Sequence, residues 1–292
     1  MVDTVVLLMA YGTPAKSEEV GPYLKDVFGG RDVPEHIVKE TVRKYNAIGF
    51  SPLKEITNRQ AELLEARLRN GGLDCKVTIG MKHWHPKIEE AILQIRELGP
   101  KNIIGMVAHP FRSLAGSEEY KHRFILASHG LNSIFIDDWY LQKPLHSLWG
   151  KNIEEAMSEL GRDETFVIFT SHGLPNSIKD DVYKKQLLDF AADIAIENGI
   201  EQCCLAYQNG EHKDWYEPEV MEKLKELTAT GIKKVLIVPI GYLSDSLETL
   251  YDIDVMYKAE ADKMGLKLYR VKCPNTSQEL IEAMAGAVES SV

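Results

Sequence analysis

The chain has 292 residues, of which 44% are hydrophobic and 27% charged, and its formal net charge is −10. Such a composition is typical of a globular protein with room for two domains, and the acidic balance disfavours nucleic acid as a partner, because phosphate binding needs a basic surface. No apolar run reaches the ~18 residues of a transmembrane helix, and the apolar start lacks a signal peptide's basic flank and cleavage site. We therefore expect a cytoplasmic protein.

Short β-branched runs and amphipathic stretches alternate along the chain. The runs predict eight buried strands at residues 4–9, 76–80, 102–108, 133–137, 165–170, 202–206, 234–239 and 267–271. Between them, a helical period predicts helices at residues 58–68, 86–98, 142–161, 182–198, 221–228, 247–264 and 277–287. This alternation predicts parallel sheets with helices on both faces.

The eight predicted strands divide into two sets of four. We expect an α/β protein of two Rossmann-like, doubly wound domains, each with a four-stranded parallel sheet, at residues 1–141 and 142–292. The two domains would face each other across a cleft, and the last helix is a candidate to pack back on the first domain. Residues 14–57, with helical patches at 17–28 and 34–47, form an insertion suited to a lid over the cleft.

Several common catalytic and cofactor-binding motifs are absent from the sequence. The dinucleotide-binding and P-loop glycine patterns, the serine-hydrolase elbow and the zinc-protease helix motif do not occur. The four cysteines form no C-x-x-C pair, which favours reduced thiols and predicts neither a zinc knuckle nor an iron–sulfur cluster. We expect no tightly bound cofactor.

Two segments carry the strongest chemical signals, and each follows a predicted strand. His172 ends the first, and Asp245, Glu248 and Asp252 lie at i, i+3 and i+7 in the second. A histidine and a row of carboxylates at the carboxyl end of a sheet can bind a divalent metal or move protons. The structural alternatives are a histidine bonded to a loop carbonyl, and a capping box formed by Asp245 and Glu248.

Further polar residues follow the strands of the first domain. Tyr11 follows the first strand, and Lys82 and His83 follow the second, beside a tryptophan that offers a flat apolar wall. Ser117 and Tyr120 follow the third strand and are candidates to bind an anionic ligand. Each of these, taken singly, is also compatible with a solvated loop residue.

Taken together and in order, these segments resemble the ferrochelatase family. The resemblance rests on MAYGTP at residues 9–14, YNAIGFSPL at 45–53, MKHWHP at 81–86, SHGLP at 171–175, SDSLETLYD at 244–252 and RVKCPN at 270–275. It covers nearly the whole chain. It implies insertion of ferrous iron, as a substrate, into protoporphyrin IX or coproporphyrin III held in the cleft during haem biosynthesis.

The resemblance also implies roles for individual residues. His172 and Glu248 would bind iron and handle protons, Tyr11 would face the metal from the first domain, and Asp245 and Asp252 would extend an acidic path. The porphyrin-binding residues would be Tyr45, Ser51, Lys82, His83, Ser117 and Tyr120. A protein that donates iron or accepts haem is an expected kind of partner.

The chain departs from the family pattern at Ser246, where many members carry histidine, and across residues 207–218. These departures leave two alternatives open. One is a chelatase that loads cobalt or iron into a sirohydrochlorin-type ring, which carries more carboxylates and should need a more basic cleft. The other is a carrier that binds porphyrin or haem without catalysis, and it would need neither His172 nor Glu248.

Overall fold

The computed structural model describes residues 2–208 and 214–292, so the predicted segment 207–218 lies partly outside the described residues. All eight predicted strands are present, with ends that differ by one or two residues. The strands are β1 (Thr4–Ala10), β2 (Cys75–Met81), β3 (Asn102–Val107), β4 (Asn132–Ile136), β5 (Thr165–His172), β6 (Cys203–Gln208), β7 (Lys234–Val238) and β8 (Lys267–Arg270).

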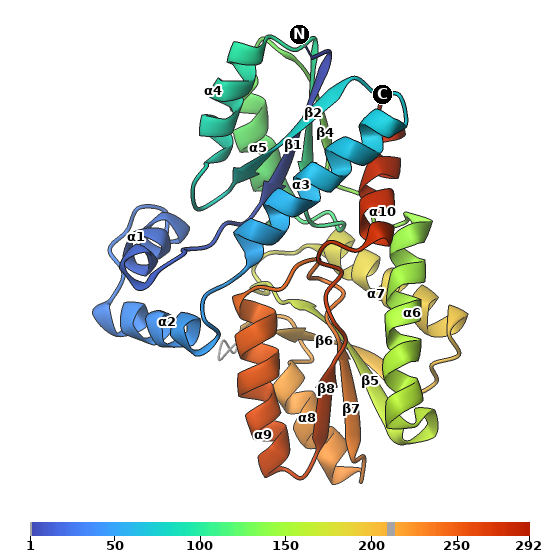
Figure 1. Ribbon diagram of the computed structural model, residues 1–292. Helices are drawn as coiled ribbons and strands as arrows, with labels where there is room; N and C mark the ends of the chain where they lie inside the picture. Colours follow the sequence, from blue (N-terminus) through green and yellow to red (C-terminus); the bar gives the residue numbers. More distant parts are fainter. Residues whose placement is uncertain (1, 209–213) are drawn as a thin grey trace.

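The strands form two separate four-stranded sheets, and all pairs are parallel (Figure 1). The orders are β2-β1-β3-β4 in what we call the N-terminal half and β6-β5-β7-β8 in the C-terminal half. Each sheet therefore reverses its strand order between two central strands, β1 and β3 or β5 and β7. Ligands bind at such switch points in doubly wound sheets, at the carboxyl ends of the strands.

Helices cover the sheets and form the insertion after β1. They are α1 (Ser17–Val27), α2 (Glu35–Ala47), α3 (Leu53–Asn70), α4 (Ile88–Leu98), α5 (Ser117–Ala127), α6 (Lys143–Leu160), the 3₁₀ turn η1 (Arg162–Glu164), α7 (Asp181–Glu197), α8 (Val220–Ala229), the π-helix η2 (Glu248–Tyr257), α9 (Lys258–Lys263) and α10 (Gln278–Glu289). All seven residues of β1 are buried, because helices pack on both faces of this sheet.

Two of these helices differ from the sequence prediction. Helix α5 was not predicted, although acids at Glu118 and Glu119 occupy its first turn, as is common at helix starts. Tyr120 and Phe124, four residues apart, are its buried apolar residues, and Phe124 packs so closely on β3 that only glycine fits at Gly105. The predicted helix 247–264 begins instead as the π-helix η2 and continues as α9.

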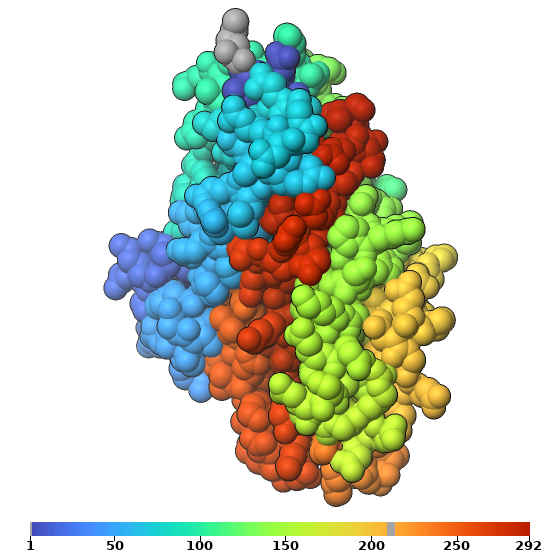
Figure 2. All heavy atoms as spheres, turned by 45° about the vertical axis from the view of Figure 1, so that its right-hand side comes forward, coloured from blue at the N-terminus to red at the C-terminus, as the bar shows by residue number. Residues whose placement is uncertain are grey.

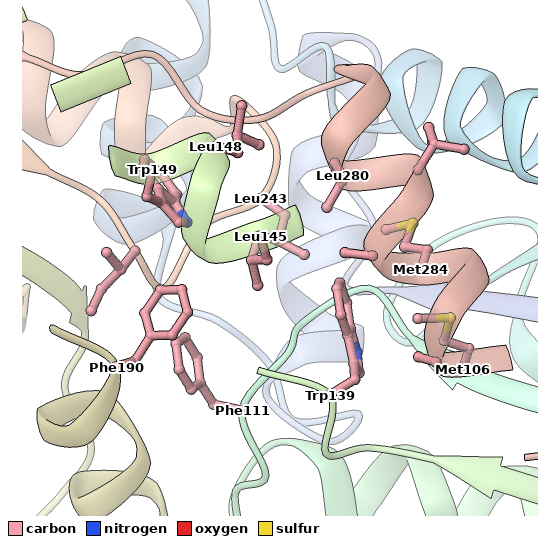
Figure 3. Packing of buried hydrophobic residues seen from close by; sticks show 14 of the residues in the cluster. Met106, Phe111, Trp139, Leu145, Leu148, Trp149, Phe190, Leu243, Leu280 and Met284 are labelled. Atoms are coloured by element: carbon pink, nitrogen blue, oxygen red, sulfur yellow. The ribbon is translucent and has the colours of Figure 1, made fainter. Parts of the chain in front are cut away.

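An apolar core shared by the two halves joins them. Figure 3 shows its side chains gathering from α6, α7, α10 and the loops of both halves. The labelled members are Met106, Phe111 and Trp139 from the N-terminal half, and Leu145, Leu148, Trp149, Phe190, Leu243, Leu280 and Met284 from the C-terminal half. We call this set the interdomain core.

The last helix packs back across the boundary between the halves. Helix α10 contacts α3 of the N-terminal half and α6 of the C-terminal half, and its surface lies in the seam between them (Figures 1 and 2). Arg67 of α3 forms ion pairs with Glu282 and Glu289 of α10 at 2.7 and 2.9 Å. These pairs are partly exposed, so the apolar side of α10 contributes most of the stabilisation.

We expect Leu280→Ala to lower the free energy of unfolding by about 2–5 kcal/mol, because Leu280 is fully buried and the variant leaves a cavity in the interdomain core. Urea unfolding measures the change. The matched control is Leu93→Ala, at a position 64% exposed, which should change stability by less than about 0.5 kcal/mol. Equal effects of the two variants would contradict a central role for α10.

Candidate active site

A cleft lies between the carboxyl ends of the two sheets. Its cavity has a volume of about 380 Å³, and residues of both halves and of the insertion after β1 line it. This volume is within the usual range for small-molecule sites. Of the predicted site residues, those that line the cleft are Tyr11, Tyr45, Ser51, Lys82, Ser117, Tyr120, His172 and Glu248. His83, Asp245 and Asp252 do not line it.

His172 is the last residue of β5. Its Nδ1 donates a hydrogen bond to the carbonyl oxygen of Gly173 at 2.5 Å, as the structural interpretation predicted. That bond places the ring proton on Nδ1 and leaves the lone pair of Nε2 for a ligand. The hydroxyl of Tyr183 donates to the carbonyl oxygen of His172 at 3.1 Å and fixes the end of the strand. The structural bond and a functional role are therefore compatible.

The loop after β7 passes directly beside the end of β5. A Cβ atom on Gly241 would lie only 1.9 Å from the hydroxyl oxygen of Ser171, so this approach requires glycine. The same serine hydroxyl is hydrogen-bonded to the Tyr183 hydroxyl at 2.6 Å. This close packing brings the start of η2, and Glu248 with it, to the side of the cleft that carries His172.

Glu248 is the first residue of the π-helix. Its Oε2 accepts a hydrogen bond from the hydroxyl of Ser246 at 2.6 Å, and its backbone carbonyl accepts one from Gln208 Nε2 at 3.1 Å. The other carboxylate oxygen has no such bond to Ser246. Ser246 thus holds the carboxylate of Glu248. This serine stands at the sequence position where many members of the resembled family have a histidine.

The predicted capping box between Asp245 and Glu248 is wrong. Asp245 instead forms an ion pair with Arg270 at 3.0 Å and accepts a hydrogen bond from Asn275 Nδ2 at 2.8 Å. The side chain of Arg270 is 10% exposed, and its guanidinium also pairs with Asp254, because a buried cation needs carboxylate partners. The predicted row of three acids is therefore divided, and only Glu248 lies on the cleft.

Asp252 lies about one turn after Glu248, behind the cleft wall. Burial and the charge of Glu248 raise the pKa of Asp252 to about 7, whereas Lys44 of α2 acts in the opposite direction. Lys44 also lies over the ring of Tyr251, with Nζ 5.6 Å from the ring centroid. Asp252 can therefore hold a proton near neutral pH.

Aromatic and charged residues form the opposite wall, in the N-terminal half. Tyr11 follows β1, and burial together with nearby acids raises its pKa, so the phenol stays protonated at neutral pH. Lys82 Nζ lies 5.8 Å from the centroid of the Tyr11 ring, 5.2 Å from that of Tyr120, and 2.6 Å from Glu119 Oε2. Glu119 thus already balances the charge of Lys82.

The insertion after β1 forms part of the cleft wall through Tyr23, Tyr45, Ser51 and Leu53. Its first helix is tied to the loop after β2. Asp26 of α1 bonds His83 Nδ1 at 3.0 Å and pairs with Lys87, and Trp84 Nε1 donates to Glu19 of the same helix at 3.2 Å. His83 therefore anchors the insertion, which explains why it does not line the cleft.

The cleft-lining residues that the sequence interpretation missed include His109, Tyr183 and Tyr242. His109 comes two residues after the end of β3, and the rule that drew attention to Tyr11 and His172 would have found it. Burial lowers the pKa of His109 to about 4, so its imidazole is neutral. Tyr242 belongs to the loop after β7, where no hydrophobic periodicity indicates which side chains face the cleft.

No group of three or more His, Cys, Asp or Glu side chains gathers as a metal site in the described part of the chain. The cleft therefore presents two protein donors on its C-terminal side, His172 and Glu248, rather than a closed metal cage. In the same described residues, no helix is long and apolar enough to cross a membrane.

We expect Asp252→Asn to stabilise the protein at about pH 8 by roughly 3 kcal/mol, and to have little effect at about pH 4. The folded-state pKa of about 7 is above the usual 3.8, so folding favours the protonated acid and wild-type stability falls as pH rises between these values. Urea unfolding at both pH values measures the difference. Asp262→Asn, at an exposed position, is the control, and a wild-type pH dependence in Asp252→Asn would contradict the assignment.

Comparison with known proteins agrees with this geometry. The family model described as Ferrochelatase matches residues 3–292. A ferrochelatase of Thermus thermophilus is 32% identical, with 98% of both chains covered, and a coproporphyrin III ferrochelatase of Oceanobacillus iheyensis is 33% identical, with 97% of this chain and 95% of the relative covered.

A solved structure shares the fold at low identity. The sirohydrochlorin chelatase SirB of Bacillus subtilis, with Fe3+, superposes with a TM-score of 0.60 at 12% identity and covers 99% of this chain and 95% of its own. This likeness concerns the fold alone, whereas the sequence matches extend over the full length. The chain belongs to the ferrochelatase family.

Proposed function

We propose that this chain is a ferrochelatase, a lyase-type metal chelatase that inserts ferrous iron into a porphyrin in haem biosynthesis. The observation that carries the proposal is the composition of the cleft, in which His172 and Glu248 lie on the C-terminal side and Tyr11 on the N-terminal side. Family membership over residues 3–292 supports it. Iron and the porphyrin are both substrates.

The residues of the cleft suit the chemistry of metallation. Inserting iron requires the pyrrole N–H groups of the ring to lose their protons, so bases must lie near the ring centre. We propose that His172 Nε2 and the Glu248 carboxylate accept these protons and replace water on the incoming iron. Asp252, with its pKa of about 7, then takes up a proton beside Glu248. Tyr11 stays protonated and serves to face the ring.

Ser246 supports Glu248 in this role. Its hydroxyl occupies one carboxylate oxygen at 2.6 Å, so the other oxygen is the one presented to iron or to a pyrrole proton. The donor is a neutral hydroxyl and forms no ion pair with the carboxylate. The predicted role of Asp245 in an acidic path has less support, because Arg270 binds it away from the cleft.

We propose coproporphyrin III as the ring. Relatives from Oceanobacillus iheyensis, Halalkalibacterium halodurans and Anoxybacillus flavithermus carry the name coproporphyrin III ferrochelatase. Among the described residues, Lys82 is the only Lys or Arg that lines the cleft, and Glu119 pairs with it. Neutral hydroxyls of Ser51, Ser113 and Ser117 remain to bind propionates. A sirohydrochlorin-type ring, with more carboxylates, fits this lining less well.

The proposal extends to the setting of the enzyme. All four cysteines are free, which suits a reducing compartment such as the cytoplasm, and we propose that the chain works there. It would need no resident cofactor. Exchange of iron and of the metallated porphyrin with a donor or acceptor protein completes the proposed reaction cycle.

A spectrophotometric metallation assay tests the function. Ferrous, cobaltous and zinc ions are each combined with coproporphyrin III, protoporphyrin IX and sirohydrochlorin, and the loss of the metal-free spectrum is followed. We expect ferrous iron with coproporphyrin III to give the highest kcat/KM. A preference for protoporphyrin IX would change the substrate assignment, a preference for sirohydrochlorin would support the related chelatase, and binding without turnover would support a carrier.

Three variants test the proposed bases. We expect His172→Ala to abolish metallation and to leave porphyrin binding largely intact, and Glu248→Gln to lower kcat more than Tyr11→Phe, because a carboxylate accepts a proton at neutral pH and a phenol does not. Rates come from the same assay, and porphyrin binding from fluorescence quenching. His146→Ala, outside the cleft lining, is the control. Wild-type rates in His172→Ala, or the reverse ranking of Glu248 and Tyr11, would contradict the mechanism.

A further inference from the structure

The proposed mechanism uses one imidazole, but a second one lines the same cleft. His109 belongs to the N-terminal half and follows β3, whereas His172 belongs to the C-terminal half and ends β5. Both strands are central strands of their sheets, next to a switch point. His109 therefore enters the cleft from the opposite half at the position where ligands bind in this type of sheet.

The hydrogen bonding of His109 leaves one nitrogen available. Its Nδ1 donates to the carbonyl oxygen of Phe111 at 2.9 Å, so Nε2 carries the lone pair. No described residue bonds Nε2, and it is not among the fully buried unpaired atoms in the described part of the chain. Since His109 lines the cleft, Nε2 is accessible to a ligand there.

His172 has the same arrangement, with Nδ1 bonded to the carbonyl oxygen of Gly173. Histidines that bind metals nearly always donate the other ring N–H to a carbonyl or carboxylate, which fixes the tautomer and the ring orientation. Tyr183 contacts both residues, because its ring centroid lies 6.1 Å from that of His109 and its hydroxyl donates to the His172 carbonyl. One neighbour thus contacts the ring of His109 and fixes the backbone of His172.

The hydrogen bonding of His109 favours a role as a ligand. The carbonyl of Phe111 fixes the proton of His109 on Nδ1, and Nε2 has no hydrogen-bond partner among the described residues, which is the arrangement of a metal-binding imidazole. His109 also belongs to no protein cage, as no three-donor group forms among the described residues. A single imidazole suffices when the other ligands come from a porphyrin, and imidazole is a common axial ligand of haem iron.

We propose that His109 Nε2 is a further axial ligand for the iron of a metallated porphyrin in the cleft, in addition to His172. The proposal rests on the proposed function in so far as the ligand is a porphyrin. The lone pair of Nε2 forms a coordinate bond to iron and displaces water or another ligand, and no redox change takes place. Such a bond would retain the product until an acceptor removes it.

The test uses preformed iron(III) coproporphyrin, so it does not depend on chelatase activity. Absorbance and electron paramagnetic resonance spectra are recorded for wild type, His172→Ala, His109→Phe and the double variant. We expect His172→Ala to keep an imidazole-ligated spectrum and the double variant to lose it. Affinity for iron(III) coproporphyrin should fall roughly tenfold from His172→Ala to the double variant, while affinity for metal-free coproporphyrin III stays unchanged.

Two controls separate ligation from structure. His146→Phe changes a partly buried histidine whose Nε2 bonds the Tyr140 carbonyl at 3.0 Å and which lies outside the cleft lining, so its spectra should match wild type. His109→Gln keeps a polar side chain, and thermal unfolding shows whether each variant is folded. Identical spectra of His172→Ala and the double variant, or an equal loss of affinity for the metal-free ring, would overturn the proposal.

If wild type metallates no porphyrin but the spectra change as expected, the proposed function fails and His109 remains a ligand of metalloporphyrin. If metallation proceeds and the spectra do not depend on His109, the function stands and the assignment of His109 fails. The two outcomes are therefore distinguishable.

Discussion

The apolar core shared by the two halves is the constraint on which the cleft depends. Close packing of buried side chains from both halves allows little relative movement, because protein interiors have the density of organic crystals. Buried hydrogen bonds between the two halves also help to fix their relative orientation. Gln60 of α3 donates to Ser244 and to the carbonyl of Asn275, and Gln186 of α7 accepts from the backbone N–H of Arg112. These contacts between the halves, some of them at the cleft itself, set the distance between its two walls.

Electrostatics then selects which acids face the ligand. Arg270 pairs with Asp245 and with Asp254 of η2, so the carboxylate that lines the cleft is that of Glu248, with Asp252 behind it. On the opposite wall, Glu119 neutralises Lys82. The cleft is therefore lined mostly by apolar groups and hydroxyls, with one carboxylate and two imidazoles, which suits a flat apolar ring and a divalent metal.

Most of the architecture could be predicted from local patterns. Buried strands have continuous apolar runs, and β1 and β5 were recognised for that reason; the polar residues that follow them, Tyr11 and His172, were correctly placed at the cleft. Helix α5 was missed because its apolar face is only two residues wide. Over so short a segment, the spacing of apolar residues in the π-helix η2 does not differ from that in an α-helix. The sequence therefore predicted a helix here but not its π type.

The sequence by itself determined the two parallel sheets, the insertion beside the cleft and, through the order of its motifs, the family and two polar residues that line the cleft, His172 and Glu248. These depend on periodicity and on residues close in the chain. Only the tertiary structure decided which carboxylates reach the cleft and which histidines do. Asp245 pairs with Arg270, His83 bonds Asp26, and His109 lines the same cleft as His172. Each outcome depends on a partner far away in sequence, and the competition for buried charge and hydrogen bonds is settled only when the chain is packed.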